Sequence, residues 1–154
     1  IDPEFAFYGP MGYDIGNVIG NLFFSWAYAV YVLPDGAETA SALEKTVCEL
    51  FDKTREKLSG KYDELVTFRY YRLPQFKEAW LVGVMADSMG FAGTEIIRRT
   101  VGDSKGMELT SVQDNARRVP MERALVKMGA GLILDRAAIR SGRELTERFR
   151  LILA

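Results

Sequence analysis

The length, composition and charge of the chain exclude several classes of protein. Its 154 residues carry 20 Lys and Arg against 21 Asp and Glu, and 48% of them are hydrophobic. This length suits one domain with a sizeable core, and the hydrophobic share and near-zero net charge argue against a disordered chain or a strongly basic nucleic-acid binder.

Two residue types narrow the chemistry further. The sequence has no histidine and a single cysteine, Cys48. It therefore cannot by itself supply a Ser-His-Asp triad, a zinc site with imidazole ligands or an internal disulfide. Any chemistry must use carboxylates, cations and bound metal, and we expect Cys48 to fill apolar space rather than act as a nucleophile.

Charge is distributed unevenly along the chain. The first basic residue is Lys45, whereas from Arg98 onward ten Arg and two Lys face three Asp and four Glu. This basic excess is too diffuse to indicate a nucleic-acid site. The sequence begins Ile-Asp-Pro-Glu, with neither a Met nor a basic stretch. We therefore expect no signal peptide, a cytoplasmic location and a chain cut from a longer protein.

The first predicted element is an uncharged stretch, residues 15–33, which is about as long as a membrane span. Asn17, Asn21 and Ser25 within it, and the lack of flanking Lys or Arg, argue against such a span. The alternative is a helix that is apolar nearly all round, which is typical of the central buried helix of a domain. Asn17 and Asn21 would then share one face and need partners in the core.

A second helix is predicted after a Pro-Asp-Gly turn. Asp35 and Glu38 form a capping box for it, and the pair Ser59-Gly60 ends it. The aromatic segment 62–73 then predicts a short helix, although its Thr-Phe-Arg-Tyr-Tyr run also fits a strand. Pro74 begins the next helix, which we expect to be interrupted around residues 88–93.

The last third of the chain predicts two more helices after a loop. Gly102 closes the preceding helix, and residues 103–118 read as a polar loop with one or two helical turns. Pro120 begins a helix whose apolar residues share one face: Met121, Leu125, Met128 and Leu132. Ser141 with Glu144 forms a capping box for the final helix. No segment alternates strictly enough for a strand, so the predicted class is all-α, with five to seven helices.

The first chemical feature is the tripeptide Asp2-Pro3-Glu4. Two carboxylates two residues apart in an extended segment point the same way and suit a hard cation such as Mg²⁺. The alternative is a solvated acidic turn.

Two strings carry a resemblance to a known family. Residues 1–17 read IDPEFAFYGPMGYDIGN. This string resembles the segment after the catalytic loop in the aminoglycoside and choline kinase superfamily, relatives of protein kinases in which Asp-x-Glu replaces Asp-Phe-Gly. Residues 86–102 read ADSMGFAGTEIIRRTVG and are similar to one family within it, the kinases of the sugar 5-methylthioribose in methionine salvage. The resemblance implies the helical C-terminal lobe of a protein-kinase-like fold, as one domain over residues 1–154.

The resemblance also implies roles for five residues. Asp2 and Glu4 would bind the Mg²⁺ that bridges the ATP phosphates, in an enzyme that phosphorylates the 1-hydroxyl of methylthioribose. Asp14 would hydrogen-bond the backbone of the catalytic loop, and Arg98 and Arg99 would reach the sugar. The catalytic Asp and the N-terminal lobe would lie upstream of this chain, so we expect the chain alone to be inactive. A homodimer is implied as well.

Each assignment has a plainer alternative. Asp14 also reads as a helix N-cap, and Arg98 and Arg99 as solvated cations at a helix end. For the whole chain, the alternatives are a kinase of choline, a hexose or an aminoglycoside, and a helical interaction module without enzymatic activity. Several other side chains that could suggest a site are expected to lie in the core or on the surface: the aromatic set Phe68, Tyr70, Tyr71 and Trp80 in the core, and Arg117 and Arg118 on the surface.

Overall fold

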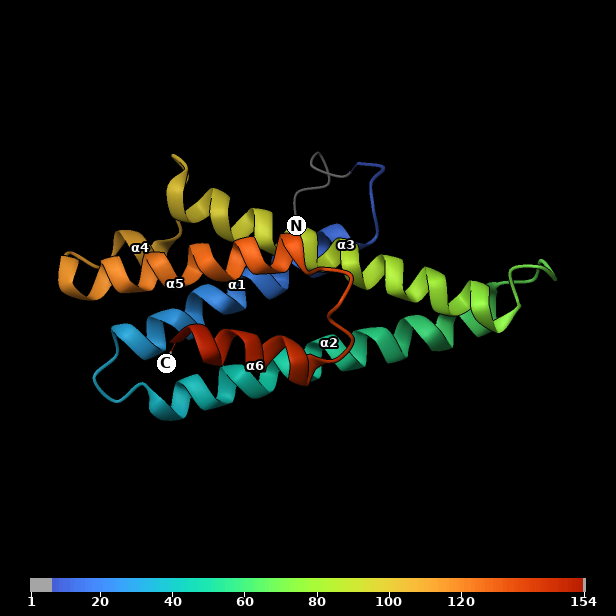
Figure 1. Cartoon of the computed structure of the whole chain (residues 1–154), viewed down its shortest axis with the longest axis horizontal. Helices are drawn as coiled ribbons and strands as arrows, with labels where there is room; N and C mark the ends of the chain where they lie inside the picture. The colour runs from blue at the N-terminus through green and yellow to red at the C-terminus, as the bar shows by residue number, and fades with distance from the viewer. Residues whose placement is uncertain (1–6, 154) are drawn as a thin grey trace.

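The computed structural model describes residues 7–153, which form a bundle of six α-helices without a strand (Figure 1). This confirms the predicted all-α class. The helices are α1 (Gly12–Tyr31), α2 (Ala37–Leu65), α3 (Pro74–Val101), α4 (Met107–Thr110), α5 (Asn115–Leu134) and α6 (Gly142–Leu153).

The central helix of the bundle is α1. It packs against α2, α3, α4 and α5, which explains why its sequence is apolar nearly all round (Figure 1). Within residues 7–153, no helix is long and apolar enough to cross a membrane. Asn17 is half-buried and Asn21 is exposed, so neither lies in the core. The Asn21 side-chain amide donates to the backbone carbonyl oxygen of Asn17 at 2.8 Å. The expectation that they need core partners is therefore wrong.

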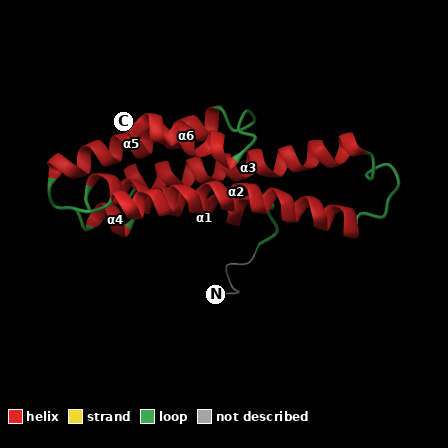
Figure 2. Ribbon diagram, turned by 90° about the horizontal axis from the view of Figure 1, so that it is seen from below, coloured by secondary structure: helices red, strands yellow, loops and turns green. Residues whose placement is uncertain are grey.

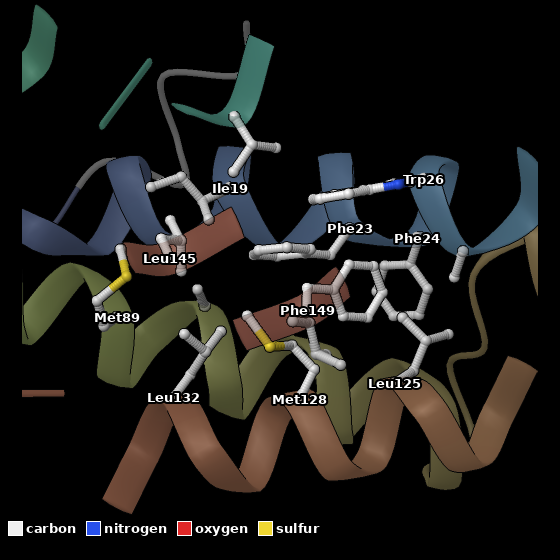
Figure 3. Packing of buried hydrophobic residues seen from close by; sticks show 14 of the residues in the cluster. Ile19, Phe23, Phe24, Trp26, Met89, Leu125, Met128, Leu132, Leu145 and Phe149 are labelled. Atoms are coloured by element: carbon white, nitrogen blue, oxygen red, sulfur yellow. The ribbon is translucent and has the colours of Figure 1, made fainter. Parts of the chain in front are cut away.

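An aromatic cluster lies at the centre of the core. Phe23 and Trp26 of α1 stack with their ring centroids 5.9 Å apart, and Phe149 of α6 meets both rings edge-on (Figure 3). The predicted apolar face of α5 closes the core from the other side and is confirmed as buried. It consists of Met121, Leu125, Met128 and Leu132.

Glycines let the backbones of three helices approach closely. A Cβ atom added at Gly16 of α1 would lie 2.5 Å from the carbonyl oxygen of Ser88 in α3. On the opposite side of α3, Gly93 faces Gly129 of α5, and a Cβ at Gly93 would lie 2.5 Å from the Gly129 carbonyl oxygen. Both distances are too short for a real Cβ atom, so helix packing explains these glycines.

This close packing corrects the prediction for α3. The expected interruption around residues 88–93 is absent, and α3 continues unbroken to Val101, with Gly102 as its C-cap. The hydroxyl of Ser88 donates within its own helix, to the carbonyl oxygen of Val84 at 2.8 Å. The small residues in this stretch are used for contact with α1 and α5, not to break the helix.

The boundaries of α2 also differ from prediction. Asp35 makes no capping hydrogen bond: Gly36 is the N-cap, and a Cβ atom there would collide with the carbonyl oxygen of Ala29. At the other end, Ser59-Gly60 does not stop the helix, which runs on to Leu65. Nothing lies within 4 Å of a Cβ added at Gly60, so this glycine serves neither as a cap nor as a packing site.

The start of α5 is corrected, whereas the capping box of α6 is confirmed. The side chain of Asp114 accepts from the Ala116 backbone, so α5 begins at Asn115 and Pro120 lies inside it. For α6, the Ser141 hydroxyl accepts from the backbone N–H of Glu144 at 3.2 Å. The Glu144 carboxylate accepts in return from the backbone of Arg140, one residue earlier than in a standard capping box.

Beyond the other helices, α2 and α3 continue as a pair (Figures 1 and 2). We call residues 58–80, which include the connecting loop, the aromatic tip. Phe68, Tyr70 and Tyr71 are each more than half exposed there, so their predicted place in the core is wrong. Phe68 meets Tyr70 and Tyr71 edge-on, Tyr71 packs on Phe76 at a tilt, and Tyr62 packs on Trp80.

Candidate functional site

A polar stripe runs along one face of the otherwise apolar α1. Asp14, Asn17, Asn21 and Ser25 recur at spacings of three and four residues, which places them on a single side of the helix. Asp14 and Asn21 are exposed, and Asn17 and Ser25 are half-buried. The stripe therefore lies at the boundary between the core and the surface, where polar side chains can bind a polar ligand or another part of the protein.

Asp14 lies at the first turn of α1 but does not cap it. The N-cap is Met11, and no side chain caps this helix end. The interpretation of Asp14 as an N-cap is therefore wrong, although its carboxylate still interacts favourably with the helix dipole. Because the Asp14 carboxylate is exposed, it is accessible to other parts of the protein. Its role in supporting a catalytic loop stays a prediction.

The twin arginines lie in the last turn of α3 and share one partner. Arg98 donates from Nε and Nη2 to the two carboxylate oxygens of Glu95, at 2.9 and 3.0 Å. Arg99 donates from Nε to Glu95 Oε1 at 2.6 Å. Adjacent residues point about 100° apart around a helix. Here a single carboxylate nevertheless brings both guanidinium groups together.

A shallow groove of about 340 Å³ extends along the polar stripe towards α4. Its polar lining is formed by Asn17, Asn21, Ser25 and Glu108, and the Ser25 hydroxyl donates to the Glu108 carboxylate at 3.5 Å. Amide, hydroxyl and carboxylate groups in one groove can both donate to and accept from a ligand rich in hydroxyl groups.

The groove and the arginines lie near the same junction of α1 with α3. Gly20 of α1 lies beside Glu95, with 3.6 Å between an added Cβ and the Glu95 Cβ. The carbonyl oxygen of Arg99 accepts from Gly106, which precedes α4 and lies near the Glu108 carboxylate. The helical turn that carries Arg98 and Arg99 is thus connected through Gly106 to Glu108 of the groove, whereas Asp14 lies in the first turn of α1.

The predicted metal ligands, Asp2 and Glu4, lie outside the described residues. Among residues 7–153, no group of three or more His, Cys, Asp or Glu side chains is arranged to hold a metal ion. A pair of carboxylates is nevertheless the donor set that Mg²⁺ takes when phosphate oxygens and water complete its coordination. The assignment of Asp2 and Glu4 as metal ligands therefore stays a prediction.

Cys48 lacks the environment of a nucleophile. Partial burial raises the pKa of its thiol, and the nearby carboxylates of Asp52, Glu49 and Glu44 raise it further. All of these effects disfavour the thiolate, which is the reactive form.

Arg117 and Arg118 lie in the first turn of α5 rather than in the predicted loop; Arg117 is exposed and Arg118 is half-buried. They bond to the Val32 carbonyl oxygen and to the Asn115 side chain.

The known proteins to which this chain is similar share one class, the small-molecule kinases. The curated relatives within that class are methylthioribose kinases. The enzyme of Erwinia tasmaniensis is 39% identical over 137 residues, which are 87% of this chain and 34% of the relative. That of Geobacillus sp. is 31% identical over 97% of this chain and 36% of the relative. Methylthioribose kinase 2 of Oryza sativa is 28% identical over 92% of this chain and 36% of the relative. No protein-family model matches the sequence.

These comparisons confirm the resemblance predicted from the two strings. Over most of its length the chain is a homologue of methylthioribose kinases, and it spans about a third of the length of the curated relatives it matches. Sequence reasoning missed Glu95 and Glu108, which complete the site described here. The signal for Glu95 was present, because it precedes Arg98 and Arg99 by three and four residues, the spacing of helical ion pairs.

Proposed function

We propose that this chain is the helical part of an ATP-dependent, Mg²⁺-requiring kinase that phosphorylates the 1-hydroxyl of 5-methylthioribose. The observation that carries the proposal is the similarity to methylthioribose kinases of bacteria and rice over 87% to 97% of the chain. The all-helical fold supports it, since the chain would form the C-terminal lobe. The proposal includes a cytoplasmic location and a homodimer.

In this proposal the chain supplies positioning and positive charge. Phosphoryl transfer depends mainly on aligning the reactants and neutralising charge on the transferring group. Asp2 and Glu4 would hold Mg²⁺, which neutralises phosphate charge when bound. Arg98 and Arg99 would donate to sugar oxygens and stabilise charge near the reacting hydroxyl. The catalytic Asp that accepts the hydroxyl proton would come from outside this chain, so the chain alone would have no activity.

The test uses the full-length gene product that contains this chain. ATP consumption is measured with methylthioribose, choline, a hexose and an aminoglycoside in parallel, with and without Mg²⁺. We expect Mg²⁺-dependent turnover of methylthioribose alone. Asp2→Ala should lower kcat by about 100-fold or more, because a metal ligand of the reacting phosphates is lost. Arg98→Ala should raise KM for the sugar, because a charge-assisted donor is lost.

A matched control and three contrary outcomes make this test decisive. Arg117→Ala removes an arginine with nearly the same exposed fraction as Arg98, 54% against 55%, and with no predicted role in the site, so it should leave turnover unchanged. Turnover of choline, a hexose or an aminoglycoside would favour another kinase of the superfamily. Turnover indifferent to Asp2→Ala would contradict the metal assignment. No turnover on any substrate would favour the helical interaction module.

A further inference from the structure

We infer that Glu95 is a positioning residue of the sugar site, one that fixes both twin arginines in the geometry that the substrate meets. This inference rests on the proposed function, in which Arg98 and Arg99 reach methylthioribose. The carboxylate of Glu95 receives three hydrogen bonds, two from Arg98 and one from Arg99, all between 2.6 and 3.0 Å. These donors and this acceptor come from a single turn of α3.

Within residues 7–153, the hydrogen bonds to Glu95 leave other N–H groups of each guanidinium without a hydrogen bond. A guanidinium has five N–H groups. Glu95 engages Nε and Nη2 of Arg98 but only Nε of Arg99, so Nη1 of Arg98 and both terminal nitrogens of Arg99 make no bond to it. Because a guanidinium is planar, fixing its Nε edge also fixes the direction of the remaining donors. Glu95 thus determines where the free N–H groups point.

The Glu95 carboxylate is more deeply buried than the two guanidinium groups that it binds. The Glu95 side chain is 11% exposed, whereas those of Arg98 and Arg99 are 55% and 37% exposed. Glu95 lies beneath the arginines and against Gly20 of α1. A ligand that approaches from solvent therefore meets the arginines first, and the carboxylate is placed to orient them rather than to bind the ligand.

The second effect of Glu95 is on charge. Two arginines and one glutamate carry a net charge of +1. Two neighbouring arginines without the glutamate would carry +2, and their guanidinium groups would repel each other. Without Glu95, the two side chains would separate into different rotamers, and substrate binding would have to restore their alignment at an entropic cost. We therefore expect the loss of Glu95 to weaken sugar binding and leave ATP binding unaffected.

The test compares two glutamates of the same helix in the full-length gene product. Glu95→Gln keeps the size of the side chain and removes the charge, and should raise KM for methylthioribose about tenfold, the usual effect of losing one charge-assisted hydrogen bond. KM for ATP should not change. Glu78→Gln is the control, because Glu78 in α3 accepts a similar two-oxygen contact from Arg55, at 2.7 and 2.8 Å, in the aromatic tip. It should leave both KM values unchanged.

A double-mutant cycle distinguishes positioning from a merely structural role. If Glu95 acts through the arginines, Glu95→Gln should have no further effect on KM once Arg98→Ala and Arg99→Ala are present. A full additional increase in that background would overturn the inference. It would also be overturned if Glu95→Gln left KM unchanged while Arg98→Ala raised it, an outcome that would spare the proposed function. If Arg98→Ala and Arg99→Ala themselves left KM unchanged, the sugar-site assignment would be wrong together with the inference.

Discussion

The body of the bundle and the aromatic tip are built from parts of the same two helices, yet they differ in what holds them together. In the body, α2 and α3 bury apolar side chains completely, including Val47, Phe51, Met89 and Ile96. In the tip, the loop between these helices exposes Phe68, Tyr70 and Tyr71. This region is held together by contacts between ring edges and by surface ion pairs such as Lys77–Asp63.

The difference shows that burial depends on neighbouring elements as well as on residue type. The body has four further helices to cover α2 and α3, whereas the tip has only its own loop (Figure 2). A groove of about 450 Å³, lined mostly by apolar side chains that include Leu58, Tyr62 and Trp80, is left open there. Surface ion pairs add little stability, so we expect stability to be concentrated in the body.

The largest expected effect comes from removing a core aromatic ring. Phe149 is fully buried against Phe23 and Trp26, so Phe149→Ala should lower the free energy of unfolding by about 3–5 kcal/mol. Phe68→Ala, in the tip, should change it by less than about 0.5 kcal/mol. Urea denaturation followed by circular dichroism measures both. Equal losses in the two variants would show that the tip is as important for stability as the body.

A smaller effect is expected from adding one methyl group at the α1–α3 contact. In Gly16→Ala the new Cβ would lie 2.5 Å from the Ser88 carbonyl oxygen, so overpacking should cost about 1–3 kcal/mol. Gly83→Ala, in α3, places its Cβ in open space and should stabilise the helix by about 0.5–1 kcal/mol. Thermal unfolding of the two variants should therefore shift in opposite directions. A stabilising Gly16→Ala would contradict the close approach of α1 and α3.

The smallest expected effect concerns the loop of the tip. The Tyr62 hydroxyl donates to the Tyr71 carbonyl oxygen at 2.6 Å, and Tyr62→Phe should cost about 0.5–1.5 kcal/mol. Because this contact is local, we expect faster amide hydrogen exchange in residues 66–73, with little change in the body. Tyr70→Phe is the control, since its hydroxyl makes no hydrogen bond within residues 7–153. Exchange that increases equally in both variants would exclude a specific role of this hydrogen bond.

Sequence reasoning predicted the helical class, the central place of α1 and the buried face of α5, because each depends on the periodicity of apolar residues. It failed where Ser59-Gly60 and residues 88–93 were expected to stop a helix and where Pro120 was expected to begin one. Gly93 and Gly129 serve contact between helices, and Pro120 is tolerated inside α5. These uses depend on the tertiary neighbours of each residue, which a local pattern does not contain.

The site was predicted less completely than the fold. The twin arginines were identified from the resemblance to kinases, but whether Arg98 and Arg99 could converge on one partner depended on side-chain geometry. The structure answers this through Glu95, whose low exposure comes from the packing of α3 on α1. Phe68, Tyr70 and Tyr71 were wrongly predicted to lie in the core, because no local pattern shows that the aromatic tip extends beyond the helices that would have covered it.

The stacking of Trp26 has a practical consequence for spectroscopy. The chain has two tryptophans, and they fall in different regions: Trp26 is 2% exposed among the rings of Phe23 and Phe149, and Trp80 is half-buried beside Tyr62. Indole fluorescence shifts to longer wavelengths as the ring meets water. The protein therefore carries an intrinsic optical reporter in the body and another in the tip. Replacing either tryptophan with phenylalanine leaves a single tryptophan, whose indole emission follows one region alone.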